Sequence, residues 1–318
     1  MKLRERPWRD APAEIGCAAF RRSRPAARWE EGIRMPSFKG IDVSKYQGRI
    51  HWAGVKSAGM KFAMIRAGVA QPDGQITLDP MFYSNLKGAA AEGISTGVYV
   101  YLLTRTFDAA KRAGGQVVSM VRDWEITYPI AADMEDRIYF SGNREENAAI
   151  VQGFLSGVAE LDYYPILYTY TAFAKEHLDM EELSAYPLWL ADYRTEPGYD
   201  GKYTMWQYSS QGEVEGISTP VDLDESYIDY PVFLREQGKN GLKPPATKWQ
   251  LNIYSFRTQS RAAEVAEAFR TLDLYCEVRP NGREWRIVMY SFSQRERAEA
   301  VSQAIRALGF YNEVQPLG

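Results

Sequence analysis

The sequence predicts an α/β protein made of a closed barrel followed by a small α+β domain, and three observations lead to this fold class. Eight short apolar runs rich in β-forming residues recur from residue 35 onward, and stretches with helical patterning separate the first five. A polar run containing Gly, Lys and Pro then interrupts the pattern at residues 237–247, which indicates a linker. The last part of the 318-residue chain, residues 248–318, contains an internal repeat.

The eight apolar runs predict the strands of the barrel. They are FKGIDVS (38–44), FAMIRAG (62–68), TGVYVYL (96–102), PIAADME (129–135), PILYTYT (165–171), PLWLADY (187–193), YTMWQYS (203–209) and VDLDES (221–226). Nearly continuous apolar strands that alternate with helices are typical of a parallel sheet covered on both faces, and eight of them suggest a barrel. Only short gaps separate the last three runs, so we expect a TIM-like (β/α)5(β)3 barrel over residues 35–236.

Residues 1–34 differ from the rest of the chain. They contain 9 Lys and Arg against 5 Asp and Glu, sustain no helical or strand periodicity, and lack the apolar segment of a secretory signal. A disordered basic arm is one interpretation. We favour a mis-called extension, with translation starting at Met35, because codons for WEEGIRM can contain a purine-rich ribosome-binding sequence. The intact mass of the native protein distinguishes the two.

The internal repeat predicts the architecture of the C-terminal domain. Residues 249–280 align without a gap on residues 285–316, and 14 of the 32 aligned positions are identical. Each copy has the pattern of a strand, a helix and a short strand. Because two βαβ-type units of this size are too small to bury separate cores, we expect one sheet backed by two helices over residues 248–318.

Composition and charge limit the possible functions. The net charge of −3 argues against a nucleic-acid binder. Residues 35–237 carry 17 Lys and Arg against 28 Asp and Glu, a balance of −11, whereas residues 248–318 carry 10 against 8, a balance of +2. No apolar run reaches the ~18 residues that would span a membrane. We therefore expect a monomer that binds neither nucleic acid nor membrane.

The few cysteines and histidines limit the chemistry further. With 2 of each, no spacing suggests a zinc site, and a Ser-His-Asp or Cys-His site has no support. We expect no metal and no cofactor. Carboxylates are the remaining candidates for catalysis.

Acidic residues follow several predicted strands, and the carboxyl ends of barrel strands meet at one face. They are Asp42, Asp133, Glu135, Asp192, Asp222 and Asp224. Asp133 and Glu135 are two apart and would lie side by side, where each raises the pKa of the other. A protonated acid beside an ionised carboxylate is what glycoside hydrolysis requires. The alternative is that these acids cap helices or pair with Arg, as Asp136 and Arg137 could do.

Aromatic residues near the same strand ends favour a sugar ligand, because a flat ring stacks on the apolar face of a pyranose. They are Tyr46, Tyr99, Tyr101, Tyr168, Trp189, Tyr193, Trp206 and Tyr208. Any one of them can instead belong to the core.

Taken in order, the segments GIDVSKYQGRIHW, FAMIRAG, GVYVY, PIAADMED, PLWLADY and MWQYSSQGEVEGI with VDLD resemble glycoside hydrolase family 25, the Chalaropsis-type N-acetylmuramidases. The resemblance covers residues 38–226. It implies cleavage of the β-1,4 bond between N-acetylmuramic acid and N-acetylglucosamine in peptidoglycan, with glycan strands as the partner.

The same resemblance implies roles for individual residues. Glu135 matches the general acid and Asp133 its carboxylate partner, which stabilises an oxocarbenium-like transition state or assists through the substrate acetamido group. The resemblance matches Asp42 and Asp192 to acids that line the site and bind or polarise the substrate. We expect the substrate-binding set to include also Tyr99, Tyr101, Tyr168, Trp206, Gln207 and Asp222. Two departures are Tyr99-Val100-Tyr101, where relatives carry Tyr-His-Phe, and DLDES, where relatives often carry Asn after Asp-Leu.

The repeat resembles a SPOR domain, a family that binds septal peptidoglycan stripped of stem peptides. By alternation, Gln250, Asn252, Tyr254 and Phe256 share one face of a strand, and Arg286, Val288, Tyr290 and Phe292 share one face of its counterpart. The resemblance implies glycan binding on the more polar face, through Gln250, Asn252 and Arg286.

Together these interpretations predict a lysozyme that acts on the bacterial cell wall and is tethered to glycan strands by its C-terminal domain. No signal peptide is seen, so the route of release stays open, with phage-type or lysis-dependent release as one possibility. The alternatives are a catalytically inactive cell-wall-binding protein and a glycosidase acting on chitin.

Overall fold

The computed structural model describes residues 37–317 except 138, 141, 246, 272–275 and 293. The predicted extension at residues 1–34 lies outside the described residues. The chain divides into two compact units. The barrel unit extends to Leu234 and also includes Lys239–Leu242, and the C-terminal unit comprises Arg235–Gly238 and Lys243–Gly318.

Eight strands form the barrel. They are β1 (Phe38–Val43), β2 (Phe62–Ala70), β4 (Ser95–Leu102), β5 (Ile130–Asp133), β6 (Pro165–Tyr170), β7 (Leu188–Ala191), β8 (Met205–Gly212) and β9 (Val221–Ser226). Strand β1 pairs with both β2 and β9, which closes the sheet. The prediction of eight strands is confirmed, and β3 (Ile76–Leu78), which was not predicted, pairs with β2.

Strand β9 runs antiparallel to both of its neighbours, whereas all the other barrel neighbours are parallel. It follows β8 through residues 213–220 alone. A parallel neighbour needs a crossover of a dozen or more residues, so this short connection can only reverse the chain.

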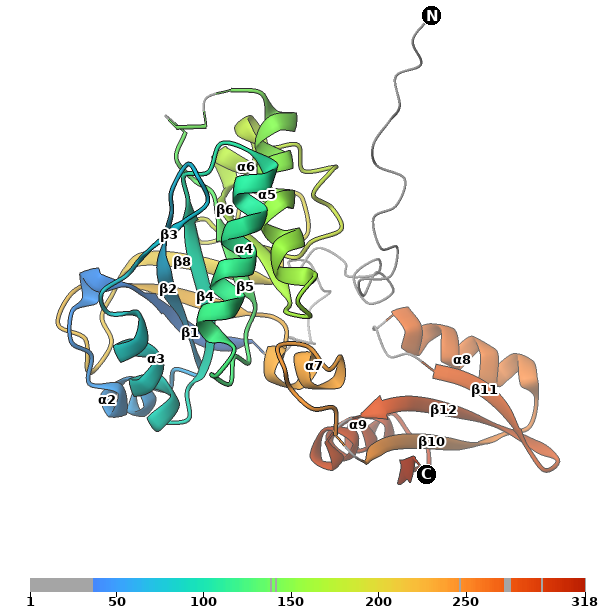
Figure 1. Ribbon diagram of the computed structural model, residues 1–318. Coiled ribbons are helices and arrows are strands. Elements are labelled where there is room, and N and C mark those ends of the chain that lie inside the picture. Colours follow the sequence, from blue (N-terminus) through green and yellow to red (C-terminus); the bar gives the residue numbers. More distant parts are fainter. Residues whose placement is uncertain are drawn as a thin grey trace, which may run out of the picture. The chain divides into compact units, whose positions relative to one another are not determined.

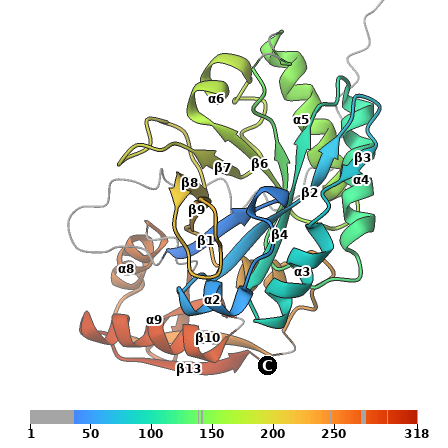
Figure 2. The same ribbon diagram turned by 90° about the vertical axis from the view of Figure 1, so that its left-hand side faces the viewer.

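Five helices follow the first five barrel strands and lie outside them (Figures 1 and 2). They are α2 (Trp52–Ser57), α3 (Phe82–Ala91), α4 (Phe107–Val121), α5 (Arg144–Ala159) and α6 (Thr171–His177). The order is the (β/α)5(β)3 arrangement that the spacing of the apolar runs predicted.

Helices α4 and α5 illustrate how the sequence sets this outer layer. Thr106 caps α4 by accepting from the Ala109 N–H, and apolar residues at a spacing of four bury one face of the helix. Glycines let the two helices approach closely. A Cβ on Gly114 would lie 2.3 Å from the Phe154 carbonyl oxygen, and one on Gly157 would lie 2.2 Å from that of Lys111.

Alternation along the barrel strands separates two buried clusters. On β5, Ile130 and Ala132 pack in the cluster that includes the helices, whereas Ala131 packs in a second cluster with Phe62 and Trp189. Because side chains alternate in direction, Asp133 faces the same side as Ala131. The interior of the barrel therefore receives the carboxylate that ends β5.

The segment predicted as a linker contributes to the barrel unit. Helix α7 (Tyr230–Glu236) precedes it. The Asn240 side-chain amide donates to the carbonyl oxygens of Ile126 and Tyr128, each at 3.0 Å, and its oxygen accepts from the Tyr164 N–H at 2.7 Å. Residues 239–242 are therefore hydrogen-bonded to the barrel, although their composition indicates a linker.

The C-terminal unit is a four-stranded antiparallel sheet with two helices. Its elements are β10 (Lys248–Phe256), α8 (Gln259–Thr271), β11 (Cys276–Asn281), β12 (Glu284–Phe292), α9 (Arg295–Ala307) and β13 (Asn312–Leu317). The strand order is β11-β12-β10-β13, so the first strands of the two copies lie side by side at the centre. Leu251 and Ile287 share one core with residues of both helices, as expected for a sheet backed by two helices.

Two irregularities in the β10–β12 pairing correct part of the predicted alternation. Register shifts occur between Ile253 and Phe256 and between Trp249 and Leu251. Phe256 and Phe292, predicted on the polar face, are buried in the core with the helices. A bulge shifts every side chain beyond it to the other face, and the sequence pattern gave no sign of one.

Candidate active site

Strand register gathers the predicted catalytic and aromatic residues at one level of the barrel. Tyr101 on β4 lies opposite Asp133 on β5, Asp133 lies opposite Tyr168 on β6, and Tyr168 lies opposite Trp189 on β7. On the other side of the barrel, Asp42 on β1 lies opposite Asp222 on β9. Residues more than 170 positions apart in sequence therefore face one space.

That space is a hollow of about 520 Å³. The described residues that line it are Asp42, Tyr46, Arg66, Val69, Tyr99, Tyr101, Leu103, Asp133, Glu135, Tyr168, Trp189, Tyr193, Gln207 and Asp222. Eight of the ten residues predicted for the barrel site are among them. Asp192 and Trp206 are not.

Asp133 and Glu135 have the electrostatics of a catalytic pair. Burial raises the pKa of Asp133 well above its usual range, the charge of Glu135 raises it further, and the guanidinium of Arg66 lowers it. Burial likewise raises the pKa of Glu135, followed by the charges of Asp222 and Asp136. Two adjacent carboxylates that disfavour each other's charge can divide the roles of acid and base.

Asp42, in the wall of the hollow, and Asp224, deeper in the barrel, form a second group of acids. Burial raises the pKa of each well above its usual range, and the charge of Asp224 raises the pKa of Asp42 further. The Trp189 indole donates to Asp224 at 2.8 Å. Asp224 is fully buried and does not line the hollow, so its place is behind Asp42 rather than beside the substrate.

Gln207 connects three walls of the hollow. Its Nε2 donates to Asp42 at 2.6 Å, and its Oε1 accepts from the hydroxyls of Tyr168 at 3.0 Å and Tyr193 at 2.8 Å. These bonds fix the orientation of the Gln207 amide and the positions of the two tyrosine rings. Gln207 and Tyr168 were predicted as substrate-binding residues, and the structure adds that they position one another.

Arg66 is a site residue that the sequence analysis missed. Its Nε donates to Asp79 Oδ2 at 2.8 Å, and its Nη2 lies 2.8 Å from the same oxygen. The Arg66 guanidinium also lies 5.1 Å from the centre of the Tyr46 ring. A charged residue within the apolar run FAMIRAG was the available signal, because a buried charge requires a partner or a use.

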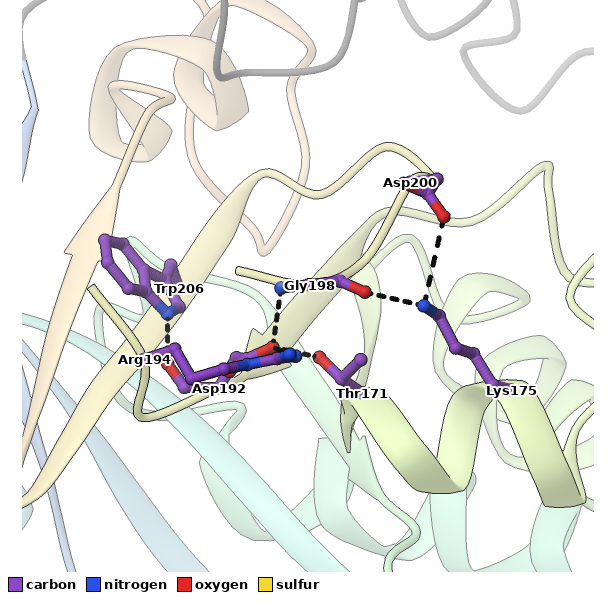
Figure 3. Close-up of polar contacts among 7 residues, drawn as sticks. All are labelled: Thr171, Lys175, Asp192, Arg194, Gly198, Asp200 and Trp206. Carbon is purple, nitrogen blue, oxygen red and sulfur yellow. Dashed lines mark hydrogen bonds and ion pairs between the residues drawn. The ribbon is translucent and has the colours of Figure 1, made fainter. Parts of the chain in front are cut away.

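Asp192 has a structural role in the loop after β7 (Figure 3). Its carboxylate accepts from Thr171 Oγ1 at 2.6 Å, from the Gly198 N–H at 2.9 Å and from the Arg194 guanidinium. Burial by itself would raise the pKa of Asp192, but these hydrogen bonds hold it well below its usual range. Asp192 is not among the residues that line the hollow, and its oxygens already have partners, so a substrate contact at Asp192 stays a prediction.

Trp206, on β8, anchors the same loop. Its indole donates to the Asp192 carbonyl oxygen at 2.7 Å (Figure 3). Its ring lies 5.6 Å from that of Tyr208, measured between the ring centres. On the other side of the loop, Lys175 donates to the Gly198 carbonyl oxygen at 2.6 Å. The indole N–H of Trp206 therefore holds the loop backbone, and the substrate contact of this residue stays a prediction.

We expect Asp192→Asn to destabilise the protein more than it impairs catalysis. The amide cannot accept all these hydrogen bonds, so the free energy of unfolding should fall by about 1–3 kcal/mol. Chemical denaturation measures it, with Asp200→Asn on the same loop as the control, because the Asp200 side chain is fully exposed. An unchanged unfolding transition with a raised KM would return Asp192 to substrate binding.

We expect Asp222→Asn to shift the pH dependence of kcat/KM. The charge of Asp222, whose own pKa is raised to about 6, is the leading electrostatic cause of the raised pKa of Glu135. Removing it lowers the pKa of Glu135, so the acid loses its proton at a lower pH. The alkaline limb of kcat/KM should therefore move to lower pH. The same pH profile for Glu213→Gln, an exposed acid outside the hollow, should match that of the unmodified protein.

The predicted glycan-binding residues of the C-terminal unit lie on the face opposite the helices. Asn252 is fully buried and donates to Gln315 at 3.4 Å, whereas Gln250 and Arg286 are half-buried. Within the described part of the chain, no cluster of three or more His, Cys, Asp or Glu is placed to hold a metal. Nor is any helix in that part long and apolar enough to span a bilayer.

A barrel whose mouth holds an Asp-x-Glu pair with raised pKa values among aromatic rings is the arrangement of a glycoside hydrolase. Residues 41–217 match the family model described as glycosyl hydrolases family 25, and the chain belongs to this family.

Individual relatives agree with the family match. The chain is 29% identical over 188 residues to the autolytic lysozyme of Clostridium acetobutylicum, a match that covers 59% of this chain and 55% of that protein. The catalytic domain of endolysin ply40 from the Listeria monocytogenes bacteriophage P40 has a TM-score of 0.54 at 25% identity, covering 63% of this chain and 98% of that domain. The spore cortex lytic enzyme SleM of Clostridium perfringens has a TM-score of 0.57 at 22% identity, with 71% and 75% covered.

Proposed function

We propose that the protein is a muramidase that cleaves the β-1,4 bond between N-acetylmuramic acid and N-acetylglucosamine in peptidoglycan. The observation that carries this proposal is the placement of Asp133 and Glu135 in one hollow, each with a raised pKa. Membership of family 25 and the similarity to an autolytic lysozyme support it.

In this mechanism Glu135 is the general acid. It is half-buried just after the end of β5, and its raised pKa favours the protonated form, which can protonate the leaving oxygen. Asp133 is the carboxylate that stabilises positive charge at the anomeric carbon or orients the substrate acetamido group. Burial and the charge of Glu135 raise its pKa, and the guanidinium of Arg66 acts in the opposite direction and favours the ionised form. The opposite wall of the hollow contains Gln207, Tyr168 and Tyr193. Their mutual hydrogen bonds hold these side chains in position for the sugar.

Product analysis tests this activity. Purified sacculi are digested, reduced with borohydride and examined by mass spectrometry. Reduced muramic-acid ends are the expected result. Reduced glucosamine ends would identify a different glycosidic bond. Turnover of soluble chitin oligomers without cleavage of sacculi would indicate a chitin-degrading enzyme, and binding to sacculi without any cleavage would indicate a wall-binding protein.

We propose further that the C-terminal unit resembles a SPOR domain in function and tethers the enzyme to glycan strands. The support is the repeat, its single sheet backed by two helices, and the contrast in charge between the acidic barrel and the mildly basic repeat. A tether raises the local concentration of substrate without any new catalytic contact. We also expect the protein to be a monomer and to act at the bacterial cell wall.

Deletion of the C-terminal unit separates the two roles. The cut belongs after Leu242 rather than at residue 237, because Asn240 and Leu242 are buried in the barrel unit. Loss of residues 243–318 should weaken binding to sacculi and leave kcat/KM on soluble fragments unchanged. Equal sedimentation of the shortened and full-length chains with sacculi would argue against tethering.

A further inference from the structure

A second hollow, of about 540 Å³, lies within the C-terminal unit at the end of β10. The described residues that line it are Tyr254, Phe256, Arg257, Thr258, Arg261, Gly309, Phe310 and Tyr311. Gln250, Asn252 and Arg286, the residues that the sequence predicted for glycan binding, are not among them. This hollow is therefore a separate candidate site.

The turn between α9 and β13 creates the aromatic side of this hollow. Gly309 adopts a φ of +87°, which lets the chain reverse directly after the helix. As a result Phe310 packs on Phe256, with ring centres 6.0 Å apart, while the next residue, Tyr311, remains 60% exposed. Tyr311 is therefore an exposed ring next to a half-buried phenylalanine that packs on the core, and it can serve as a platform for a ligand.

Tyr254 extends this platform from the neighbouring strand. Its N–H donates to the Tyr311 carbonyl oxygen at 3.0 Å, and the two ring centres lie 6.0 Å apart at an interplanar angle of 35°. The Tyr311 hydroxyl donates to Glu313 at 2.6 Å, which orients the ring by its edge. Two adjoining aromatic faces offer stacking area for a flat, partly apolar ligand such as a pyranose.

The charged residues among the described lining are two arginines. Arg257 and Arg261 are both exposed and stand at the start of α8, across from the tyrosines. Arg261 forms an ion pair of 2.7 Å with Glu264, and both side chains are more than half exposed. An exposed pair of this kind contributes little free energy, so Arg261 can exchange it for a ligand carboxylate.

We propose that this hollow binds a glycan strand whose sugars carry carboxylates. Pyranose rings stack on Tyr254 and Tyr311, and the lactyl carboxylate of muramic acid accepts from Arg257 and Arg261. The inference rests on the proposed tethering role of the C-terminal unit. It places the contact with the glycan at the end of β10 rather than on the face of the sheet opposite the helices.

Binding is measured with the full-length Glu135→Gln protein, so that the polymer stays intact. The probes are glycan strands freed of stem peptides by an amidase, and chitin oligomers, which have no carboxylate. We expect Tyr311→Ala, and separately the double variant Arg257→Gln/Arg261→Gln, each to weaken binding to the glycan strands roughly tenfold, since hydrogen bonds to charged groups and ring contacts are each of this order. The arginine variant should bind chitin oligomers as its parent does.

Two matched variants serve as controls for this experiment. Tyr311→Phe keeps the ring and should retain binding. Arg297→Gln removes the exposed arginine at the position of the second copy that corresponds to Arg261, and it should also bind normally. If the hollow variants bind normally and only Gln250→Ala and Arg286→Ala lose affinity, tethering stands and this site is wrong. If the parent binds no glycan strand, both proposals are overturned.

Discussion

Glu135→Gln is expected to lower kcat on sacculi by about 10²–10⁴-fold, the usual contribution of a general acid. The amide has the size and shape of the acid but has no acidic proton for the leaving oxygen. Binding should persist, because the aromatic lining and the Gln207 bonds are unchanged. The measurement is the rate of release of reduced muramic-acid ends, together with sedimentation of the variant with sacculi.

The control for this variant is Glu92→Gln, which makes the same chemical change at an exposed position after α3. It should have full activity. Residual activity of Glu135→Gln within tenfold of the parent would place the acid elsewhere in the hollow. Asp222, whose pKa is raised to about 6, is then the next residue to replace.

Arg66→Gln is expected to impair both stability and catalysis. The Asp79 side chain is almost fully buried and would lose its ion pair, and breaking such a pair from one side costs about 3–5 kcal/mol. Asp79 keeps hydrogen bonds from the backbone N–H groups of Lys45 and Met81, so the lower end of that range is expected. The pKa of Asp133 would also rise, because Arg66 lowers it.

A double variant separates the two effects of Arg66. Arg66→Gln/Asp79→Asn removes the uncompensated buried charge, so the unfolding transition should recover a large part of the loss. The kcat/KM should stay below that of the parent, because the loss of the Arg66 charge still raises the pKa of Asp133 and leaves less of its ionised form. If activity recovers together with stability, Arg66 acts only through the fold.

The fold could be predicted from the sequence because the patterns that indicate its strands and helices are local. Each barrel strand is a short apolar run, and a helical pattern follows each of the first five, so their number and order could be predicted. Strand β3 was not predicted, because it is only three residues long. The docking of Asn240 was missed because a polar, Gly-flanked Asn has the composition of a linker.

The chemistry of the site was partly accessible as well. An Asp-x-Glu spacing at a strand end places two carboxylates on one side whatever the rest of the fold does. The roles of Asp192 and Arg66 were not accessible, since each depends on its partners. Thr171, Arg194 and Gly198 bind Asp192, and Asp79, 13 residues along the chain, binds Arg66.

By itself the sequence determined the class of barrel, the repeat that follows it, and the position of Asp133 and Glu135 at the carboxyl end of β5. These features follow from periodicity and spacing within a few residues. Only the tertiary structure decided which acids line the hollow and which accept hydrogen bonds from the protein itself. It also decided that the rings of Tyr254 and Tyr311 lie next to each other. Those outcomes depend on barrel closure, strand register and bulges, which bring together residues far apart in the chain, and no local pattern encodes them.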